Sequence, residues 1–238
     1  MSIGTVLVTG GASGLGAAVV DAVREAGGRP VVLDRMVPDG DGSGVEHGVE
    51  HGVEHEVVDL AERSAAEDAV GRVAERHGGI DGVVTCAGID SCGRLVDVPA
   101  EDWERVVIVN LLGTVRVIRA ALPHLQASHG RVVTVSSTLG LRAVSDATAY
   151  CASKFGVVGF TRALAAETAG QVGVTLLVPG GMHTPFFDGR DEKYKPPPDA
   201  KLNRPQDVAR AVVFVLSQPP GCEVRELVVT PSMESSWP

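Results

Sequence analysis

The sequence predicts an α/β protein built on one doubly wound parallel sheet. Short apolar runs alternate with helical stretches along the 238 residues, the runs are apolar on both faces, and a glycine-rich turn follows the first run. Strands buried on both faces are typical of parallel sheets, and strand–helix alternation gives right-handed βαβ units. We expect seven parallel strands in the order 3-2-1-4-5-6-7, in a single domain spanning residues 1–238.

The individual elements follow from the apolar runs and from helix and turn signals. The first helix ends at Gly27–Gly28, a typical C-terminal stop. Residues 183–205 are rich in charge and proline, so we expect a mobile substrate lid there. Residues 231–238, which include Trp237, are interpreted as a loosely ordered tail. The expected strands lie at 5–9, 30–34, 56–60, 81–88, 131–137, 173–180 and 225–230, and the expected helices at 14–28, 62–77, 100–127, 147–169 and 205–217.

Composition argues against several classes of partner. The formal net charge is -9 and there is no stripe of Lys and Arg, so we expect binding neither to nucleic acid nor to an anionic membrane surface. No N-terminal signal peptide is apparent, and no apolar run reaches the ~20 residues that span a bilayer. We expect a cytoplasmic protein with free thiols, because no metal-binding or CxxC spacing relates the four cysteines, Cys86, Cys92, Cys151 and Cys222.

One segment, GVEHGVEHGVEH at residues 44–55, repeats a four-residue unit and spaces His47, His51 and His55 four residues apart. On a helix this spacing would align three imidazoles for Zn²⁺ or Ni²⁺, but a glycine in each unit disfavours a helix. We interpret the repeat as an expansion in a tolerant loop between the second and third strands, and we expect no metal site.

The turn TGGASGLG at residues 9–16 joins the first strand to its helix. Glycine allows the φ values of a tight turn and lets the backbone approach a pyrophosphate, which the helix N-terminus then attracts. A glycine triplet alone is a weak signal, but the strand before it and the helix after it support a dinucleotide-binding Rossmann fold. The expected contacts are Gly10, Ser13, Gly14, Leu15 and Gly16.

Asp34 ends the second expected strand, 18 residues beyond Gly16. A carboxylate at this place accepts both ribose hydroxyls of NAD and repels the additional phosphate of NADP. Arg35 points the other way, because arginine pairs with a 2′-phosphate. Ser13 is not basic and does not favour NADP. We expect NAD to be the cofactor.

Tyr150 and Lys154, in YCASK, are four residues apart and lie on one face of the expected helix. A nearby ammonium, together with the charge of an oxidised nicotinamide, favours the phenolate, which can then exchange a proton with an alcohol or ketone. Ser137 lies 13 residues upstream, at the carboxyl end of the fifth expected strand, where its hydroxyl can hold the substrate oxygen.

Taken together, these motifs resemble the short-chain dehydrogenase/reductase family in its compact single-domain form, over roughly residues 3–230. The resemblance rests on TGGASGLG, the pair Asp59–Leu60, Ala87–Gly88, Asn110, SS at 136–137, YCASK, and PGGMHT at 179–184. It implies Tyr150 as general acid/base, Lys154 as its partner on the nicotinamide ribose, Ser137 as substrate-orienting residue, and Asn110 as support of a proton-relay water. It also implies cofactor contacts at Asp59, Leu60, Ala87, Gly88, Asn110, Pro179, Gly180 and Thr184.

The sequence departs from the family pattern after the fourth expected strand, where TCAG replaces the usual Asn-Asn-Ala-Gly. Cys86 is interpreted there as a small buried filler rather than a reactive thiol. Phe186 and Phe187 are equally suited to line an apolar pocket or to anchor the lid. Arg190, Lys193 and Lys195 are interpreted as solvated charges of the lid, with binding of an acidic substrate as the alternative.

We therefore expect an NAD-dependent oxidoreductase that acts on a small-molecule secondary alcohol or ketone. The resemblance also implies a homodimer or homotetramer built partly on the long helices around 103–125 and 150–168. One alternative is an NADP-dependent 3-oxoacyl thioester reductase, which Arg35 favours and Asp34 opposes. A second alternative is a non-catalytic nucleotide-binding or scaffold protein.

Overall fold

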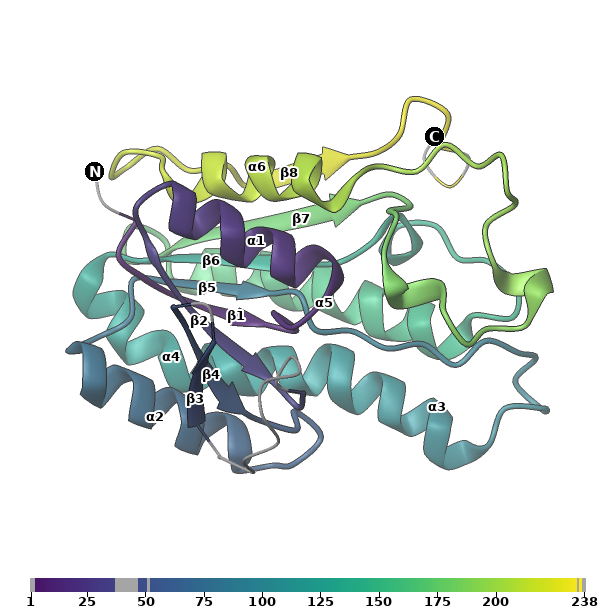
Figure 1. Ribbon diagram of the computed structural model, residues 1–238, viewed down its shortest axis with the longest axis horizontal. Coiled ribbons are helices and arrows are strands. Elements are labelled where there is room, and N and C mark those ends of the chain that lie inside the picture. The colour runs from purple at the N-terminus through teal and green to yellow at the C-terminus, as the bar shows by residue number, and fades with distance from the viewer. Residues whose placement is uncertain (1–2, 37–46, 51, 235, 237–238) are drawn as a thin grey trace.

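The computed structural model describes residues 3–36, 47–50, 52–234 and 236, which build one eight-stranded sheet between two layers of helices (Figure 1). The strands are β1 (Thr5–Thr9), β2 (Arg29–Asp34), β3 (His47–Glu50), β4 (Val53–Val57), β5 (Gly82–Thr85), β6 (Arg131–Val135), β7 (Gly173–Pro179) and β8 (Glu226–Val229). The α-helices are α1 (Gly14–Glu25), α2 (Ala65–His77), α3 (Ala100–Val107), α4 (Thr114–Ser128), α5 (Thr148–Glu167) and α6 (Pro205–Leu216).

The sheet order is β3-β4-β2-β1-β5-β6-β7-β8. Every neighbouring pair is parallel except β3 with β4, which is antiparallel. The order reverses between β1 and β5, the switch point at which ligands bind in doubly wound sheets. The predicted seven-stranded parallel sheet in the order 3-2-1-4-5-6-7 is confirmed, and the structure adds one antiparallel strand at its edge.

The repeat forms this added edge. The prediction of a loop was wrong for residues 47–50 and 53–55, because β3 and the start of β4 form a hairpin in which Gly48 lies opposite His55. Gly52, with a φ of 79°, provides the left-handed backbone of the turn. His51 lies outside the described residues. The third strand accordingly begins three residues before the predicted 56–60.

A charged strand can lie here because α2 neutralises it. The Glu56 side chain is fully buried and accepts hydrogen bonds from Arg72 Nε and Nη2 at 2.9 and 2.7 Å. Arg76 bonds both Glu54 and Glu56, and His77 Nε2 lies 2.7 Å from Glu54 Oε2. The sequence favoured a strand at 56–60 because the side chains that neutralise Glu54 and Glu56 lie in α2, the next helix along the chain.

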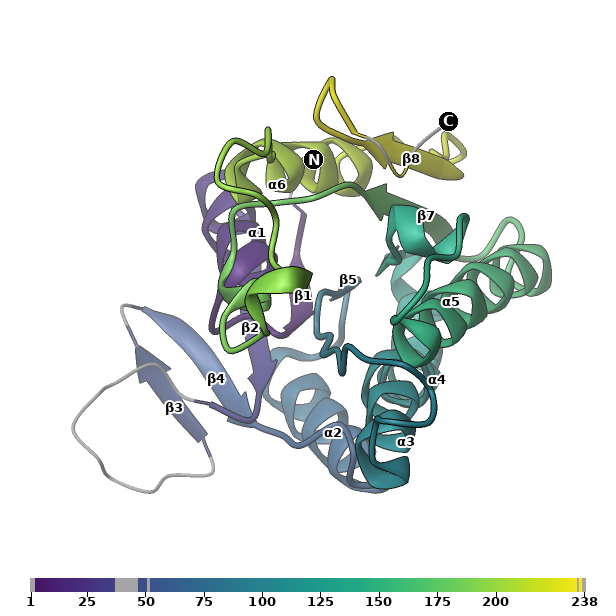
Figure 2. The same cartoon turned by 90° about the vertical axis from the view of Figure 1, so that its right-hand side faces the viewer.

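Two helical layers cover the sheet, and Figure 2 looks onto the carboxyl ends of its strands. α1 and α6 pack together on one face, whereas α2, α4 and α5 cover the other. Fully buried valines and leucines from the strands, such as Val8 and Leu7, face the two layers alternately. The two cores fix the strand ends that carry the site.

The predicted helix at 100–127 is one continuous helical stretch from α3 to α4, with a π-helical segment, η1 (Ile108–Gly113), between them. Its length and mean hydropathy of 1.7 over the best window would suffice for a membrane span. Val117, Ile118, Ala121 and Leu125 of α4 are instead buried in the core against the sheet. This burial is typical of a core helix.

Candidate active site

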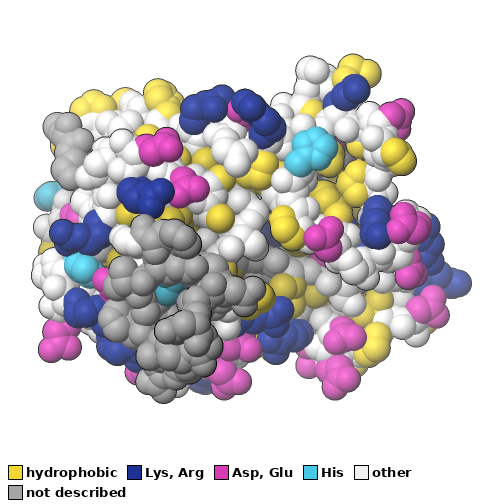
Figure 3. Space-filling view, in the orientation of Figure 1, with side chains coloured by type: hydrophobic (Ala, Val, Ile, Leu, Met, Phe, Trp, Pro, Cys, Tyr) yellow, Lys and Arg dark blue, Asp and Glu magenta, His cyan; other side chains and the backbone are white. Residues whose placement is uncertain are grey.

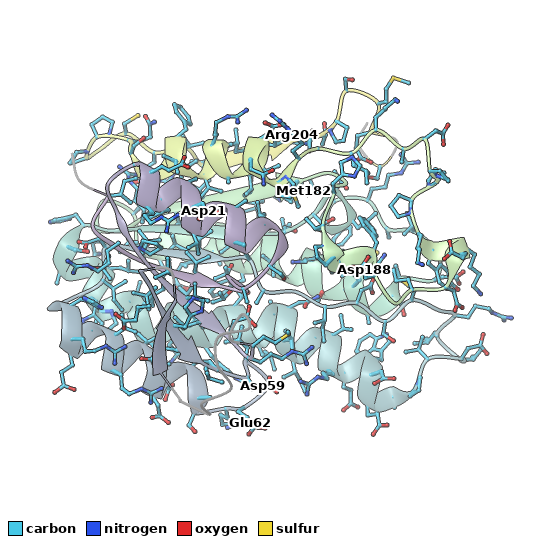
Figure 4. All side chains as sticks on the ribbon, in the orientation of Figure 1. Asp21, Asp59, Glu62, Met182, Asp188 and Arg204 are labelled. Carbon is cyan, nitrogen blue, oxygen red and sulfur yellow. The ribbon has the colours of Figure 1, made fainter. Side chains whose placement is uncertain are left out.

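A cleft with a volume of about 950 Å³ lies at the carboxyl ends of the parallel strands. Asp59, Met182 and Asp188, which are labelled in Figure 4, all line it, and the last two lie on the segment that follows β7. On the face shown in Figure 3, basic and acidic side chains are interspersed rather than gathered by sign. Every predicted site residue except Asn110 lines the cleft: Gly10, Ser13, Gly14, Leu15, Gly16, Asp34, Arg35, Asp59, Leu60, Ala87, Gly88, Ser137, Tyr150, Lys154, Pro179, Gly180 and Thr184.

The glycine turn forms a cradle that side chains would fill. Gly10 has a φ of 68°, and a Cβ on it would lie 2.7 Å from the Ala87 Cα atom. A Cβ on Gly16 would lie 2.0 Å from the Gly10 carbonyl oxygen, so helix α1 packs directly on the turn. The first N–H groups of α1 have no partner within the helix and point toward the turn, as a pyrophosphate requires. These residues fit a dinucleotide.

Asp34 lies beside this cradle, at the end of β2. Its two carboxylate oxygens accept hydrogen bonds from the backbone N–H groups of Ala12 and Met36, both at 3.1 Å. The carboxylate is therefore held at the turn, where the ribose of a bound dinucleotide is expected. Arg35 is exposed and also lines the cleft.

The cleft carries a second fixed acid, Asp59. It accepts hydrogen bonds from Ala61 N at 2.8 Å and from Arg105 Nη2 at 3.0 Å. Partial burial opposes ionisation, but these bonds and the charges of Arg105 and Arg35 hold the pKa of Asp59 below its usual value. Asp59 is therefore ionised at neutral pH.

The unusual TCAG segment keeps its place beside the turn. Ala87 N donates to Thr9 Oγ1 at 3.1 Å, and Cys86 N donates to the Thr9 carbonyl at 3.2 Å. Burial raises the pKa of the Cys86 thiol to about 12, against the charge of Lys154. The thiol is thus neutral and packs against the core, which agrees with the interpretation of Cys86 as a filler.

Ser137, Tyr150 and Lys154 form one wall of the cleft. Ser137 follows β6, where its Oγ accepts a hydrogen bond from Leu139 N at 3.1 Å and caps a short 3-10 turn. Helix α5 presents Tyr150 and Lys154 one turn apart, and both are buried. Lys154 Nζ donates to the Val135 carbonyl at 3.0 Å and lies 5.6 Å from the centroid of the Tyr150 ring.

Burial shifts the pKa values of both groups toward the neutral forms. It raises the pKa of Tyr150 well above 10, although a hydrogen bond with Ser137 and the charge of Arg190 act in the opposite direction. It lowers the pKa of Lys154 to about 8. The expected stabilisation of the phenolate is therefore outweighed within the protein by desolvation, and the phenol carries its proton at neutral pH.

Asn110 lies in η1, behind the cleft wall. Its Nδ2 donates to the Ile89 carbonyl at 2.9 Å and to Ser153 Oγ at 3.1 Å, while its Oδ1 accepts from Ile89 N at 2.8 Å. A Cβ on Gly88 would lie 3.6 Å from both Asn110 Oδ1 and Lys154 Nζ. Asn110 thus fixes the backbone after β5 next to the lysine, and its role toward a water stays a prediction.

The segment 183–205, predicted to be a substrate lid, lines one side of the cleft. Its base is held by His183 N donating to the Asn203 carbonyl at 2.9 Å, and Asn203 N to the Gly181 carbonyl at 3.0 Å. Tyr194 Oη donates to Asp146 Oδ2 at 3.3 Å. The Phe186 and Tyr150 ring centroids lie 5.6 Å apart, so this segment reaches the wall that carries Tyr150.

Several cleft residues were not singled out as site residues by the sequence, namely Asp90, Arg190, Glu234 and Ser236. The interpretation of Arg190 as solvated was wrong, because its side chain is only 15% exposed. The loose-tail interpretation was wrong for residues 231–234 and 236: Glu234 Oε2 accepts from Gly181 N at 2.8 Å and Ser236 Oγ donates to Thr138 Oγ1 at 2.7 Å. Trp237 lies outside the described residues. The one sequence feature that could have indicated these cleft residues is that their segments follow strands at the carboxyl edge of the sheet.

A dinucleotide cradle and a Ser-Tyr-Lys wall in one cleft define an oxidoreductase that uses a nicotinamide cofactor and acts on CH–OH groups. A family model described as short chain dehydrogenase matches residues 4–195. The chain belongs to this family.

Relatives across the family agree with this assignment. A 3-oxoacyl-[acyl-carrier-protein] reductase of Thermotoga maritima is 32% identical, covering 89% of each chain. L-fucose dehydrogenase of Mus musculus is 32% identical, covering 98% of this chain and 89% of its own length. The ligand-free aldohexose dehydrogenase of Thermoplasma acidophilum has a TM-score of 0.82 at 24% identity, covering 95% of this chain and 92% of its own, and supports the fold.

Proposed function

We propose that the protein is an NAD-dependent dehydrogenase that interconverts a secondary alcohol and a ketone. The observation that carries this proposal is the placement of Tyr150, Ser137 and Lys154 on one wall of the cleft that also holds the glycine turn. A wall of this kind next to a dinucleotide cradle serves proton exchange beside hydride exchange, the chemistry that a bound nicotinamide supplies.

Each residue of the wall has a distinct task. The Tyr150 hydroxyl gives a proton to the substrate oxygen in reduction and takes one in oxidation. Ser137 holds the same oxygen from the strand side. Lys154, fixed on the Val135 carbonyl, supplies positive charge next to the phenol and a donor for the nicotinamide ribose.

Asp34 supports NAD as the cofactor. Its carboxylate is tethered to the backbone at Ala12 and Met36, so it cannot swing away from a ribose placed at the turn. A 2′-phosphate there would meet a fixed negative charge in a partly buried place, which costs binding energy.

A second candidate is an NADP-dependent 3-oxoacyl thioester reductase. Arg35 favours it, because this exposed guanidinium lines the cleft directly after Asp34. The Thermotoga maritima reductase also supports it, whereas the fucose dehydrogenase supports oxidation of an alcohol. A non-catalytic nucleotide-binding or scaffold role is the weakest candidate, since the whole wall is assembled.

We also propose a homo-oligomer in the cytoplasm, formed through η1 and α5. Leu112 and Phe155 are apolar yet 41% and 44% exposed, and the two elements that carry them contact each other. Exposed apolar side chains on adjoining elements are suited to an interface between copies. Light scattering on the purified protein tests the oligomer, and Phe155→Glu is expected to lower the measured mass.

Paired fluorescence titrations with NADH and NADPH, followed by assays on secondary alcohols, test the main proposal. We expect tighter binding of NADH. Tyr150→Phe is expected to keep this binding and to lower kcat by about 10²- to 10⁴-fold. Turnover by Tyr150→Phe at the wild-type rate would refute the assigned mechanism, and tighter binding of NADPH would favour the reductase.

A further inference from the structure

Arg190 is a partly buried cation in the segment 183–205, and it lines the cleft. Its guanidinium carbon lies 4.5 Å from the Phe186 ring centroid and 4.9 Å from that of Phe187. The aromatic faces hold the guanidinium in place and keep its surroundings apolar. Its side chain is 15% exposed, so the charge is not simply solvated at the surface.

One buried nitrogen of Arg190, Nη2, has no hydrogen-bond acceptor among the described residues. Nη2 lies 3.0 Å from Asp90 Oδ2, but the geometry is that of an ion contact: within residues 3–36, 52–234 and 236, no acceptor forms a hydrogen bond with this buried atom. A buried donor without an acceptor costs free energy, more so when it is charged. Such a group in a substrate cleft is suited to a ligand oxygen.

Asp90, by contrast, has its oxygens engaged. Oδ1 accepts a hydrogen bond from Ser91 N at 2.7 Å, and Oδ2 accepts one from Cys92 Sγ at 3.3 Å besides facing Arg190. Its side chain is 7% exposed. Asp90 is thus fixed by its own loop and positions Arg190. The hydrogen-bonding group of this pair that remains without a partner is the Nη2 donor of Arg190.

Stability alone gives no reason for the pair. Bringing two charges out of water costs about as much as their attraction returns, and apolar side chains of similar size often stabilise a protein equally well. The Phe186 ring relates the pair to the chemistry, because it contacts both groups: its centroid lies 4.5 Å from the guanidinium carbon and 5.6 Å from the centroid of the Tyr150 ring. Arg190 is therefore one aromatic side chain away from the proton donor.

We propose that Arg190 binds the carboxylate of the substrate, and that the substrates are short hydroxy acids and the corresponding oxo acids. Arginine offers planar paired donors that match a carboxylate, and apolar walls strengthen such bonds. The carboxylate itself is unchanged by the reaction. This inference rests on the proposed function, since it places the reacting carbon at Tyr150.

Matched acids and esters test this proposal. The probes are 2-oxobutanoate, 3-oxobutanoate and 4-oxopentanoate, each against its methyl ester, with the nicotinamide cofactor that binds more tightly. We expect wild type to prefer at least one acid over its ester by about 10-fold or more in kcat/KM. In Arg190→Met, kcat/KM for this acid should fall about 10²-fold, whereas kcat/KM for its ester should change little. Arg190→Lys should give an intermediate value for the acid. Equal use of acids and esters by wild type, or equal losses for both in Arg190→Met, overturns the proposal.

Asp90→Asn distinguishes anion binding from a latch that only holds the lid. If Arg190 binds the substrate, removing the neighbouring negative charge leaves acid binding equal or tighter. If the pair is only a latch, Asp90→Asn and Arg190→Met weaken acid and ester alike, which contradicts the proposal.

Calorimetry of the same acids separates this inference from the proposed function. Binding that is lost in Arg190→Met but kept in Tyr150→Phe supports the inference even if no carbonyl is reduced. Reduction of the esters without any Arg190-dependent binding of the acids supports the proposed function and refutes the inference.

Discussion

The ammonium of Lys154 lies 5.6 Å from the centroid of the Tyr150 ring and is anchored by the carbonyl oxygen of Val135. This anchor ties the lysine to β6 rather than to the phenol oxygen. The positive charge is therefore fixed beside the ring whatever the protonation state of Tyr150. Helix α5 and strand β6 together fix the distance between this charge and the Tyr150 ring.

The buried lysine predicts a change of stability with pH. Burial lowers the pKa of Lys154 to about 8, whereas the unfolded chain keeps the ordinary 10.5. Between these values the unfolded chain binds the proton more often, so the contribution of Lys154 to the free energy of unfolding rises with pH. Denaturant unfolding of wild type and Lys154→Met from about pH 7 to about pH 10 should show that the free energy of unfolding of wild type, taken relative to that of Lys154→Met, rises with pH. Parallel curves would show that the lysine is not desolvated.

The glycine turn predicts a pair of opposite effects. Gly16→Ala places a Cβ 2.0 Å from the Gly10 carbonyl oxygen. We therefore expect the free energy of unfolding to fall by about 1–3 kcal/mol and cofactor binding to weaken. Gly71→Ala is the matched control, since nothing lies within 4 Å of its Cβ on helix α2. The free energy of unfolding of Gly71→Ala should rise by about 0.5–1 kcal/mol. Unfolding and NADH titration measure both, and an unaffected Gly16→Ala would contradict the close packing.

The edge hairpin predicts that removing the charge of Glu56 lowers the free energy of unfolding considerably. Glu56→Gln leaves Arg72 and Arg76 without their fully buried carboxylate and should destabilise by roughly 3 kcal/mol. Glu226→Gln is the control, because its pair with Arg162 is about half exposed, and it should cost below about 1 kcal/mol. Similar midpoints for the two variants in urea would mean that the ion pairs of the buried Glu56 carboxylate add little to stability.

The acid at the end of β2 predicts a switch of cofactor. Asp34→Asn removes the charge that repels a 2′-phosphate, so we expect NADPH to gain and NADH to lose about 10-fold in affinity. Arg35→Met is the counterpart and should weaken NADPH alone. Fluorescence titration gives both constants. If Asp34→Asn left the NADH to NADPH ratio unchanged, Asp34 would not be the selector.

The sequence predicted the parts of the fold that depend on local pattern. The parallel strands and the glycine turn were recognised because apolar runs and turn glycines act over a few residues. The third strand was misplaced since VEHEV is charged, and only Arg72 and Arg76 from the next helix make its burial possible. Such pairing depends on tertiary structure, which no local pattern contains.

The same division holds for the site. Ser137, Tyr150 and Lys154 were predicted to share a wall because helical spacing and strand ends determine where they lie. The meeting of Asp90 with Arg190, 100 positions apart in the chain, depends on how the lid folds back. The contact of Glu234 with Gly181 likewise depends on the path of the chain after β8.

The edge hairpin bears on how this gene segment can vary. A unit of four residues is an even number, so gaining or losing one GVEH copy leaves every later side chain on the same face of the strand. The inward Val53 and His55 and the carboxylates bonded to α2 would keep their orientation through such a change. Length variation by whole units is thus compatible with the sheet, whereas insertion of a single residue would turn every later side chain of the strand to the opposite face.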